Sequence, residues 1–144
     1  VVGDAPYQAD YIAHLHRLAG PSTLFTGYVF GQGYRELCSN AYLFVEPSEV
    51  GGTHPALLEA MALGNCVVAN GIPENREALG DAGLVYDGQL GSAGLKPLLD
   101  HLLASPQTVE TYRQRAQARA DAHYRWKQIT DAYEALFAQV TGGK

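Results

Sequence analysis

Short apolar runs recur along residues 1–86 at intervals of about 15–25 residues, and segments with helical spacing separate them. The runs cover residues 1–2, 23–29, 42–46, 66–70 and 84–86. The segments between them predict helices over residues 8–19, 34–40, 55–63 and 74–79. Alternation of short strands with helices is typical of βα units that build a parallel sheet. The sequence therefore predicts an α/β fold: a Rossmann-like parallel sheet with flanking helices.

Three further helices are predicted after the last apolar run, over residues 95–104, 106–122 and 126–140. The last of them carries one apolar stripe, formed by Trp126, Ile129, Tyr133, Leu136, Phe137 and Val140. A stripe of this kind needs an apolar surface to cover it. The three arginines of the middle helix, Arg113, Arg115 and Arg119, predict a solvated polar face, or a contact with a membrane surface or a partner. A length of 144 residues predicts one domain, 1–144.

Charge and cysteine usage exclude several classes of protein. The net charge of −5 and the pI of about 5.4 argue against bulk electrostatic binding of nucleic acid. Cys38 and Cys66 lie far apart and outside any CxxC pair, so they imply neither a zinc site nor a disulfide framework. We expect both to be buried thiols of a cytoplasmic protein. No apolar run approaches the roughly 18 residues of a membrane span.

The densest chemical signal lies in residues 45–61. A strand is expected to end near Glu46, a loop with Gly51 and Gly52 follows, and a helix begins at Pro55. This is the carboxyl edge of a parallel sheet, where open α/β folds place their ligands. The two glycines let the backbone approach a ligand closely, and the helix N-terminus suits a diphosphate. The spacing therefore indicates an anion site that needs no lysine.

Glu59 follows Pro55 by one helical turn, and helical side chains lean toward the N-terminus. A bound phosphate would repel its carboxylate, so its useful role is to accept hydrogen bonds from hydroxyls such as those of a ribose. His54 either caps the helix or contacts a phosphate or sugar. A structural alternative stays open, in which the two glycines form an ordinary turn and Glu59 is a solvated partner of the helix dipole.

Residues 48–69 resemble the C-terminal, nucleotide-sugar-binding domain of GT-B glycosyltransferases of family 4. The resemblance rests on the helix Leu-Leu-Glu-Ala-Met-Ala at 57–62 and on Gly-Asn-Cys-Val-Val-Ala at 64–69. Residues 24–29, 36–41, 74–83 and 125–137 resemble further segments of that domain in the same order. The resemblance covers essentially the whole chain. It implies the donor domain of an enzyme that moves a hexose or deoxyhexose from a nucleoside-diphosphate sugar to a glycan acceptor, with retention and no obligatory metal or cofactor, in surface polysaccharide synthesis.

The resemblance also implies roles for individual residues. Glu59 would bind the ribose hydroxyls, and the backbone of residues 51–53, Gly-Gly-Thr, would approach the diphosphate and the transferred sugar. Tyr28 and Val29 would lie at the nucleobase site. The family places a glutamate eight residues before Glu59, where this chain has Gly51. Glu49 lies two residues earlier and is kept as a candidate donor contact.

That departure has a counterpart within the family. Residues 50–55, Val-Gly-Gly-Thr-His-Pro, look like the loop of rhamnosyltransferase-like members. The catalytic residues are not identified by the resemblance.

Family members are two-domain enzymes whose donor domain opens with one more strand and helix than this chain contains. We therefore expect a fragment without its first βα unit and without the family's Arg and Lys for the diphosphate. It would bind nucleotide weakly, transfer nothing alone, and close the gap of a central strand by rearrangement or by pairing with another chain. The other domain of the parent would bind the acceptor, and dimerisation and peripheral membrane contact are compatible with this scheme. Two alternatives are a nucleotide-sugar epimerase of the same fold and a non-catalytic α/β interaction module.

Overall fold

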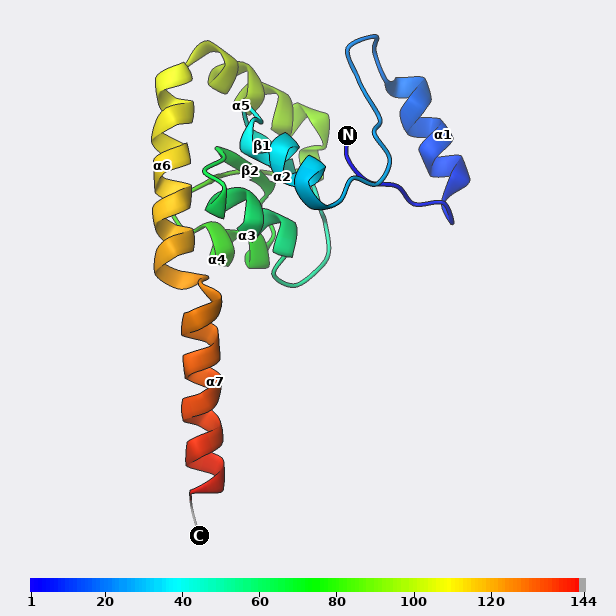
Figure 1. Ribbon diagram of the computed structural model, residues 1–144. Coiled ribbons are helices and arrows are strands. Elements are labelled where there is room, and N and C mark those ends of the chain that lie inside the picture. The colour runs from blue at the N-terminus through cyan, green and yellow to red at the C-terminus, as the bar shows by residue number, and fades with distance from the viewer. Residues whose placement is uncertain (143–144) are drawn as a thin grey trace. The chain divides into compact units, whose positions relative to one another are not determined.

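The computed structural model describes residues 1–142 and falls into two compact units, Val1–Leu37 and one that begins at Cys38. Figure 1 gives the order of the elements along the chain. The first unit contains helix α1 (Ala9–Leu18), which the sequence predicts, and most of α2 (Gly31–Ser39), which begins before its predicted start at residue 34. No residue of the first unit is buried. Without a core of its own, this unit gains little free energy from apolar burial.

The prediction of strands over residues 1–2 and 23–29 is wrong. These segments form one isolated antiparallel bridge between Gly3 and Gly27, and the amide of Gly3 donates to the carbonyl of Gly27 over 2.8 Å. Both glycines have positive φ, 116° and 65°, which turns the backbone out of the extended conformation. Two short segments without a third strand or a covering helix rarely hold a regular ladder in water.

The second unit contains the predicted parallel sheet. Strands β1 (Phe44–Glu46), β2 (Val67–Asn70) and β3 (Leu84–Tyr86) pair in the order β1-β2-β3, and Val68 of β2 lies opposite both Val45 and Leu84. All four residues of β2 are buried. The first three residues of β2 are apolar, as expected of a central parallel strand whose two faces are covered by helices, and Asn70 ends the strand.

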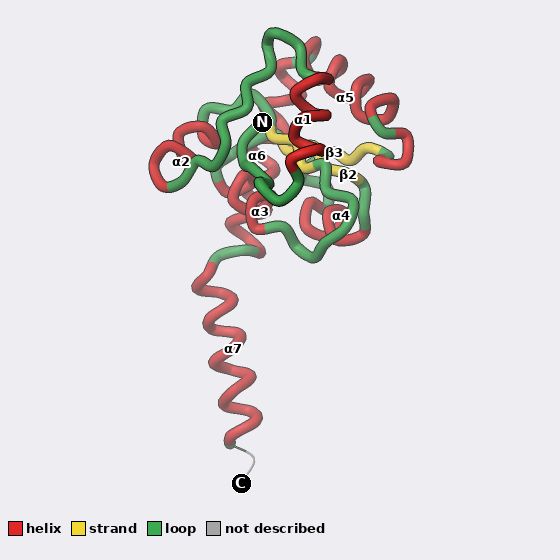
Figure 2. The backbone as a smooth tube through the Cα atoms, turned by 90° about the vertical axis from the view of Figure 1, so that its right-hand side faces the viewer, coloured by secondary structure: helices red, strands yellow, loops and turns green. Residues whose placement is uncertain are grey.

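The remaining elements of the second unit are α3 (Pro55–Ala62), α4 (Pro73–Leu79), the 3-10 helix η1 (Gly88–Leu90), α5 (Ser92–Ala104), α6 (Pro106–His123) and α7 (Trp126–Thr141). The predicted helices form, with bounds that differ by up to three residues. Figure 2 shows α5 on one side of the strands and α3 and α4 on the other.

Alternation along β2 divides the core between the two faces of the sheet. Val67 packs with Leu57, Met61 and Leu79, which belong to α3 and α4. Val68, one residue further, packs on the other face in a cluster that includes Leu102 of α5 and Val109 of α6. This is the period-two pattern of a strand with two buried faces.

Two of the three arginines of α6 do not form the solvated face that the sequence predicts. The guanidinium of Arg113 donates to the carbonyls of Ala41 and Tyr42 over 2.6 and 2.9 Å, which fixes the chain just before β1. Arg119 donates to two carbonyls at the C-terminal end of α4, those of Glu77 and Ala78, over 2.8 Å each. The two bonds of Arg119 satisfy carbonyls that a helix leaves unpaired at its C-terminus.

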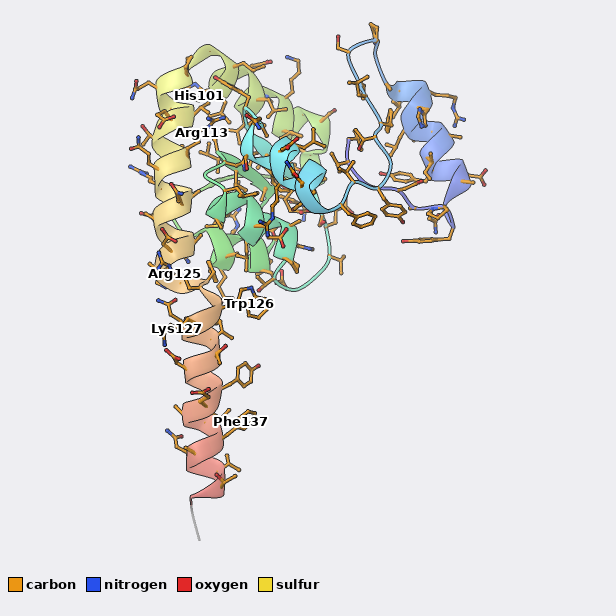
Figure 3. All side chains as sticks on the ribbon, in the orientation of Figure 1. His101, Arg113, Arg125, Trp126, Lys127 and Phe137 are labelled. Atoms are coloured by element: carbon orange, nitrogen blue, oxygen red, sulfur yellow. The ribbon has the colours of Figure 1, made fainter. Side chains whose placement is uncertain are left out.

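Helix α7 has no buried residue, and Trp126 is 85% exposed. Figure 3 shows Trp126 and Phe137 on one side of α7 and Lys127 on the other, as the predicted stripe requires. The helix is thus confirmed, and its apolar side chains lie outside the core of this chain.

Candidate functional site

The loop that joins β1 to α3 begins with a buried carboxylate. Glu46, the last residue of β1, is only 8% exposed. Its Oε1 accepts hydrogen bonds from the backbone N–H of Ser48, over 3.1 Å, and from the Ser48 hydroxyl. A buried carboxylate needs such partners, because an unpaired charge away from water is costly. Glu46 therefore fixes the first turn of the loop at the carboxyl edge of the sheet.

Asn70 connects the three loops at this edge. It ends β2, is 6% exposed, and donates from Nδ2 to the carbonyl of Ser48 over 3.2 Å. Its Oδ1 accepts from the backbone N–H of Gly88, which follows β3, over 3.1 Å. A Cβ at position 88 would lie 2.3 Å from that Oδ1, so only glycine fits there beside Asn70. No sequence pattern predicts this network, although Asn70 and Glu46 are polar residues that end apolar runs.

A pocket of about 380 Å³ opens at the same edge. It is lined by Glu49, Asn70, Gly71, Ile72, Pro73, Asp87, Gly88 and Gln89. The carboxylate of Asp87 also accepts the backbone N–H of Gln89 over 2.9 Å and so caps η1. Of the predicted site residues only Glu49 lines this pocket.

Two carboxylates, one at the end of β1 and one in the loop after it, act on the hydroxyl of Tyr86, the last residue of β3. Burial raises the pKa of the Tyr86 hydroxyl, and the charges of Glu49 and Glu46 raise it further. Both carboxylates therefore act on the end of β3, where the pocket opens.

The N-terminus of α3 lies at the end of the same loop. His54 is the N-cap residue of α3, as predicted, but its side chain makes no capping hydrogen bond. Its ring packs on Gly51 instead: a Cβ at Gly51, where φ is 156°, would lie 2.5 Å from Cε1 of His54. The buried Nε2 of this ring has no partner among the described residues. Gly51, Gly52 and Thr53 are exposed beside it.

Glu59 is exposed and lines a different pocket. This pocket, of about 230 Å³, lies between α3, α6 and the start of α7, and Pro55, Tyr124 and Trp126 are among its other lining residues. Glu59 shares the pocket with Pro55, the first residue of α3, and with Ala62, its last residue. Within the second unit, the structure therefore assigns Glu49 and Glu59 to two separate pockets.

Tyr28 and Val29, the predicted nucleobase contacts, belong to the first unit. The ring of Tyr28 stacks on that of Phe30 with centroids 5.8 Å apart, and Val29 lies against Gly33 of α2.

Cys38 and Cys66 are buried free thiols, as predicted, and burial raises the pKa of Cys66 to about 11. None of the helices within residues 1–142 combines the length and the apolar character that a bilayer crossing requires.

Comparisons with known proteins identify the family and the fold of this chain. The family model described as glycosyl transferases group 1 matches residues 1–104. No curated protein matches the chain.

Among solved structures, sucrose-phosphate synthase from Thermosynechococcus elongatus is similar, with a TM-score of 0.83 and 21% identity over 99% of this chain. HepE of Anabaena, solved in complex with UDP, gives a TM-score of 0.86 and 22% identity over 96%. This chain spans 38% and 40% of the length of those two proteins. The fold is that of the C-terminal domains of GT-B glycosyltransferases. With more than half of its residues matched by the family model, the chain belongs to the glycosyl transferases group 1 family.

Proposed function

We propose that this chain is the donor-binding domain of a glycosyltransferase of family 4, with the loop of its rhamnosyltransferase-like members. The parent enzyme takes a nucleoside-diphosphate sugar and moves its hexose or deoxyhexose to a glycan, with retention, in cytoplasmic steps of surface polysaccharide synthesis. The observation that carries the proposal is the uncapped N-terminus of α3, which follows three exposed small residues at the carboxyl edge of the sheet.

This arrangement suits a diphosphate. The His54 side chain leaves the first turn of α3 without a side-chain acceptor, and exposed Gly51 and Gly52 let a ligand reach the backbone. A helix N-terminus offers N–H groups and a partial positive charge, which bind phosphate without a basic side chain. The complex of HepE with UDP supports the choice of a nucleoside diphosphate as the ligand class.

Glu59 then accounts for the ribose. It lies one turn after Pro55, about 6 Å along the helix axis, and its carboxylate is exposed. A carboxylate accepts hydrogen bonds only, so it binds the paired hydroxyls of a ribose and repels the phosphates. Diphosphate at the helix N-terminus and ribose at Glu59 give the nucleotide one orientation.

The parent needs more than this chain for turnover. The chain spans about two fifths of the solved structures that it matches, so the acceptor and the catalytic groups are assigned to the rest of the parent. We expect the 144-residue chain to bind nucleotide weakly and to transfer no sugar. Measurable turnover by the chain alone would contradict this part of the proposal.

The test is an NMR titration of the chain with UDP, GDP and dTDP. We expect saturable binding of at least one nucleotide, weakened about tenfold or more in Glu59→Gln, because hydrogen bonds to a charged group are worth about 1.5–3 kcal/mol. Glu77→Gln removes an exposed carboxylate on α4 and should leave the affinity unchanged. Absence of binding by all three nucleotides would refute the proposal and favour an interaction module. Product analysis with the parent enzyme separates transfer from epimerisation.

A further inference from the structure

The pocket at the carboxyl ends of β2 and β3 has no role in the nucleotide site described above. Its residues come from three loops: Glu49 after β1, Gly71 after β2, and Asp87 and Gln89 after β3. Ligands of open α/β sheets bind at this edge. Its volume of about 380 Å³ falls within the usual range of ligand pockets.

The base of this pocket is held rigidly. Asn70 uses both ends of its carboxamide, on the carbonyl of Ser48 and on the N–H of Gly88. The backbone N–H of Gly71 donates to the carbonyl of Tyr86 over 2.8 Å, and Arg76 donates from Nε to the carbonyl of Gly71 over 2.8 Å. Loops tied together in this way keep their lining groups in place before a ligand arrives, which lowers the entropy lost on binding.

The side chains that line the pocket are acidic or neutral, and Arg76 uses its Nε on the carbonyl of Gly71. Glu49 and Asp87 contribute carboxylates, Gln89 contributes a carboxamide, and none of the described side chains that line the pocket is basic. Carboxylates accept hydrogen bonds and repel phosphate or a second carboxylate. Among the described residues no group of three His, Cys, Asp or Glu side chains is placed to hold a metal ion. A neutral group rich in hydroxyls satisfies these acceptors best.

We propose that this pocket is a subsite for an uncharged sugar ring, in which Glu49 and Asp87 accept its hydroxyls and exclude sugars that carry a carboxylate or phosphate. The proposal rests on the proposed function for the class of ligand. Asp87 and Gln89 would then determine which sugar binds, a role that the resemblance to family 4 does not give them. Glu49 would contact the sugar in this pocket rather than at the N-terminus of α3. The sugar comes either from the nucleotide-sugar donor or from the acceptor glycan.

The test compares four probes by NMR titration of the full chain: UDP, UDP-glucose, UDP-glucuronate and methyl α-glucoside. The variants are Glu49→Gln and Asp87→Asn, and Asn keeps the capping group of η1. Asp81→Asn is the matched control, since it removes an exposed carboxylate before β3, at the opposite end of that strand.

We expect each pocket variant to lower the affinity for UDP-glucose about fivefold or more, as for loss of a charge-assisted hydrogen bond. The affinity for UDP should be unchanged. The ratio of the affinity for UDP-glucose to that for UDP-glucuronate should fall in both variants. A purely structural role of Glu49 and Asp87 would leave this ratio unchanged. If the glucoside alone responds to the variants, the subsite stands and its sugar belongs to the acceptor.

Three results would overturn the subsite. The first is that the variants lower the affinity for UDP and for UDP-glucose by the same factor. The second is that the variants change the affinity for neither UDP-glucose nor the glucoside. The third is that wild type binds UDP-glucuronate as tightly as UDP-glucose. Failure of the proposed function is distinguishable, because it appears as absent binding of UDP, GDP and dTDP to wild type, whatever the pocket variants do.

Discussion

Gly88 and Asn70 form a pair whose energetic coupling is set by their packing. Replacement of Gly88 by alanine puts a Cβ 2.3 Å from Oδ1 and 2.4 Å from Nδ2 of Asn70. The backbone of Gly88 has no positive φ, so alanine brings no backbone strain there. The Asn70 side chain must therefore move, and its hydrogen bonds to Ser48 and Gly88 break.

The cost follows from those two bonds. Each broken bond leaves a polar group unsatisfied in a nearly buried position, which costs about 1–3 kcal/mol per group. Gly88→Ala should therefore lower the free energy of unfolding by about 3 kcal/mol. Asn70→Ala breaks the same bonds and should cost a similar amount. In the Asn70→Ala background the clash is gone, so adding Gly88→Ala should cost less than about 1 kcal/mol. The predicted coupling energy is about 2 kcal/mol or more, in the range seen for residues in contact.

The assay is urea unfolding of the four proteins of this double-mutant cycle, followed by circular dichroism. Gly52→Ala is the control, because a Cβ there meets no atom within 4 Å. Additive effects of the two substitutions, or a neutral Gly88→Ala, would refute the description of Asn70 as the residue that joins the three loops.

Three further predictions concern separate contacts. Gly51→Ala should destabilise the chain by about 1–3 kcal/mol in thermal unfolding, because its Cβ meets the imidazole 2.5 Å away at a φ of 156°, whereas Gly52→Ala should change little; equal effects would contradict the packing of that loop. Arg119→Met should cost about 1.5–3 kcal/mol through lost bonds to the end of α4, against less than about 1 kcal/mol for Arg115→Met, which loses only an exposed contact with an aromatic ring; the reverse order in chemical denaturation would rule this out. Burial raises the pKa of Cys66 from 9.0 to about 11, so the unfolded chain ionises first and the free energy of unfolding should fall as pH rises from about 9 toward 11. Cys66→Ala should flatten that decline, and an unchanged slope would show that the thiol is not responsible.

Local signals sufficed for the sheet and helices of the second unit. Pro55 at the first position of α3 and Gly64 after its end mark that helix from sequence alone. The strands over residues 1–2 and 23–29 failed for a non-local reason. A strand forms only with neighbours and a covered face, and an apolar run does not reveal whether this chain supplies them.

The site was predictable only in part, for the same reason. Residues 45–61 indicate the loop and the helix N-terminus, because strand end, glycines and helix start follow one another in the chain. The contacts of Asn70 with Ser48 and Gly88 join residues 22 and 18 positions apart, so they depend on the order of the strands. The division of Glu49 and Glu59 between two pockets likewise needs the three-dimensional arrangement of loop and helix.

The most direct test of the central claim is the change in backbone amide chemical shifts when UDP is added to the labelled chain. If a diphosphate binds the N-terminus of α3, the largest shifts should fall on Gly51, Gly52, Thr53 and the first turn of α3. They should saturate with the same affinity as the ligand's own ³¹P signals. Saturable binding with its largest shifts elsewhere, and none on residues 51–58, would contradict the claim.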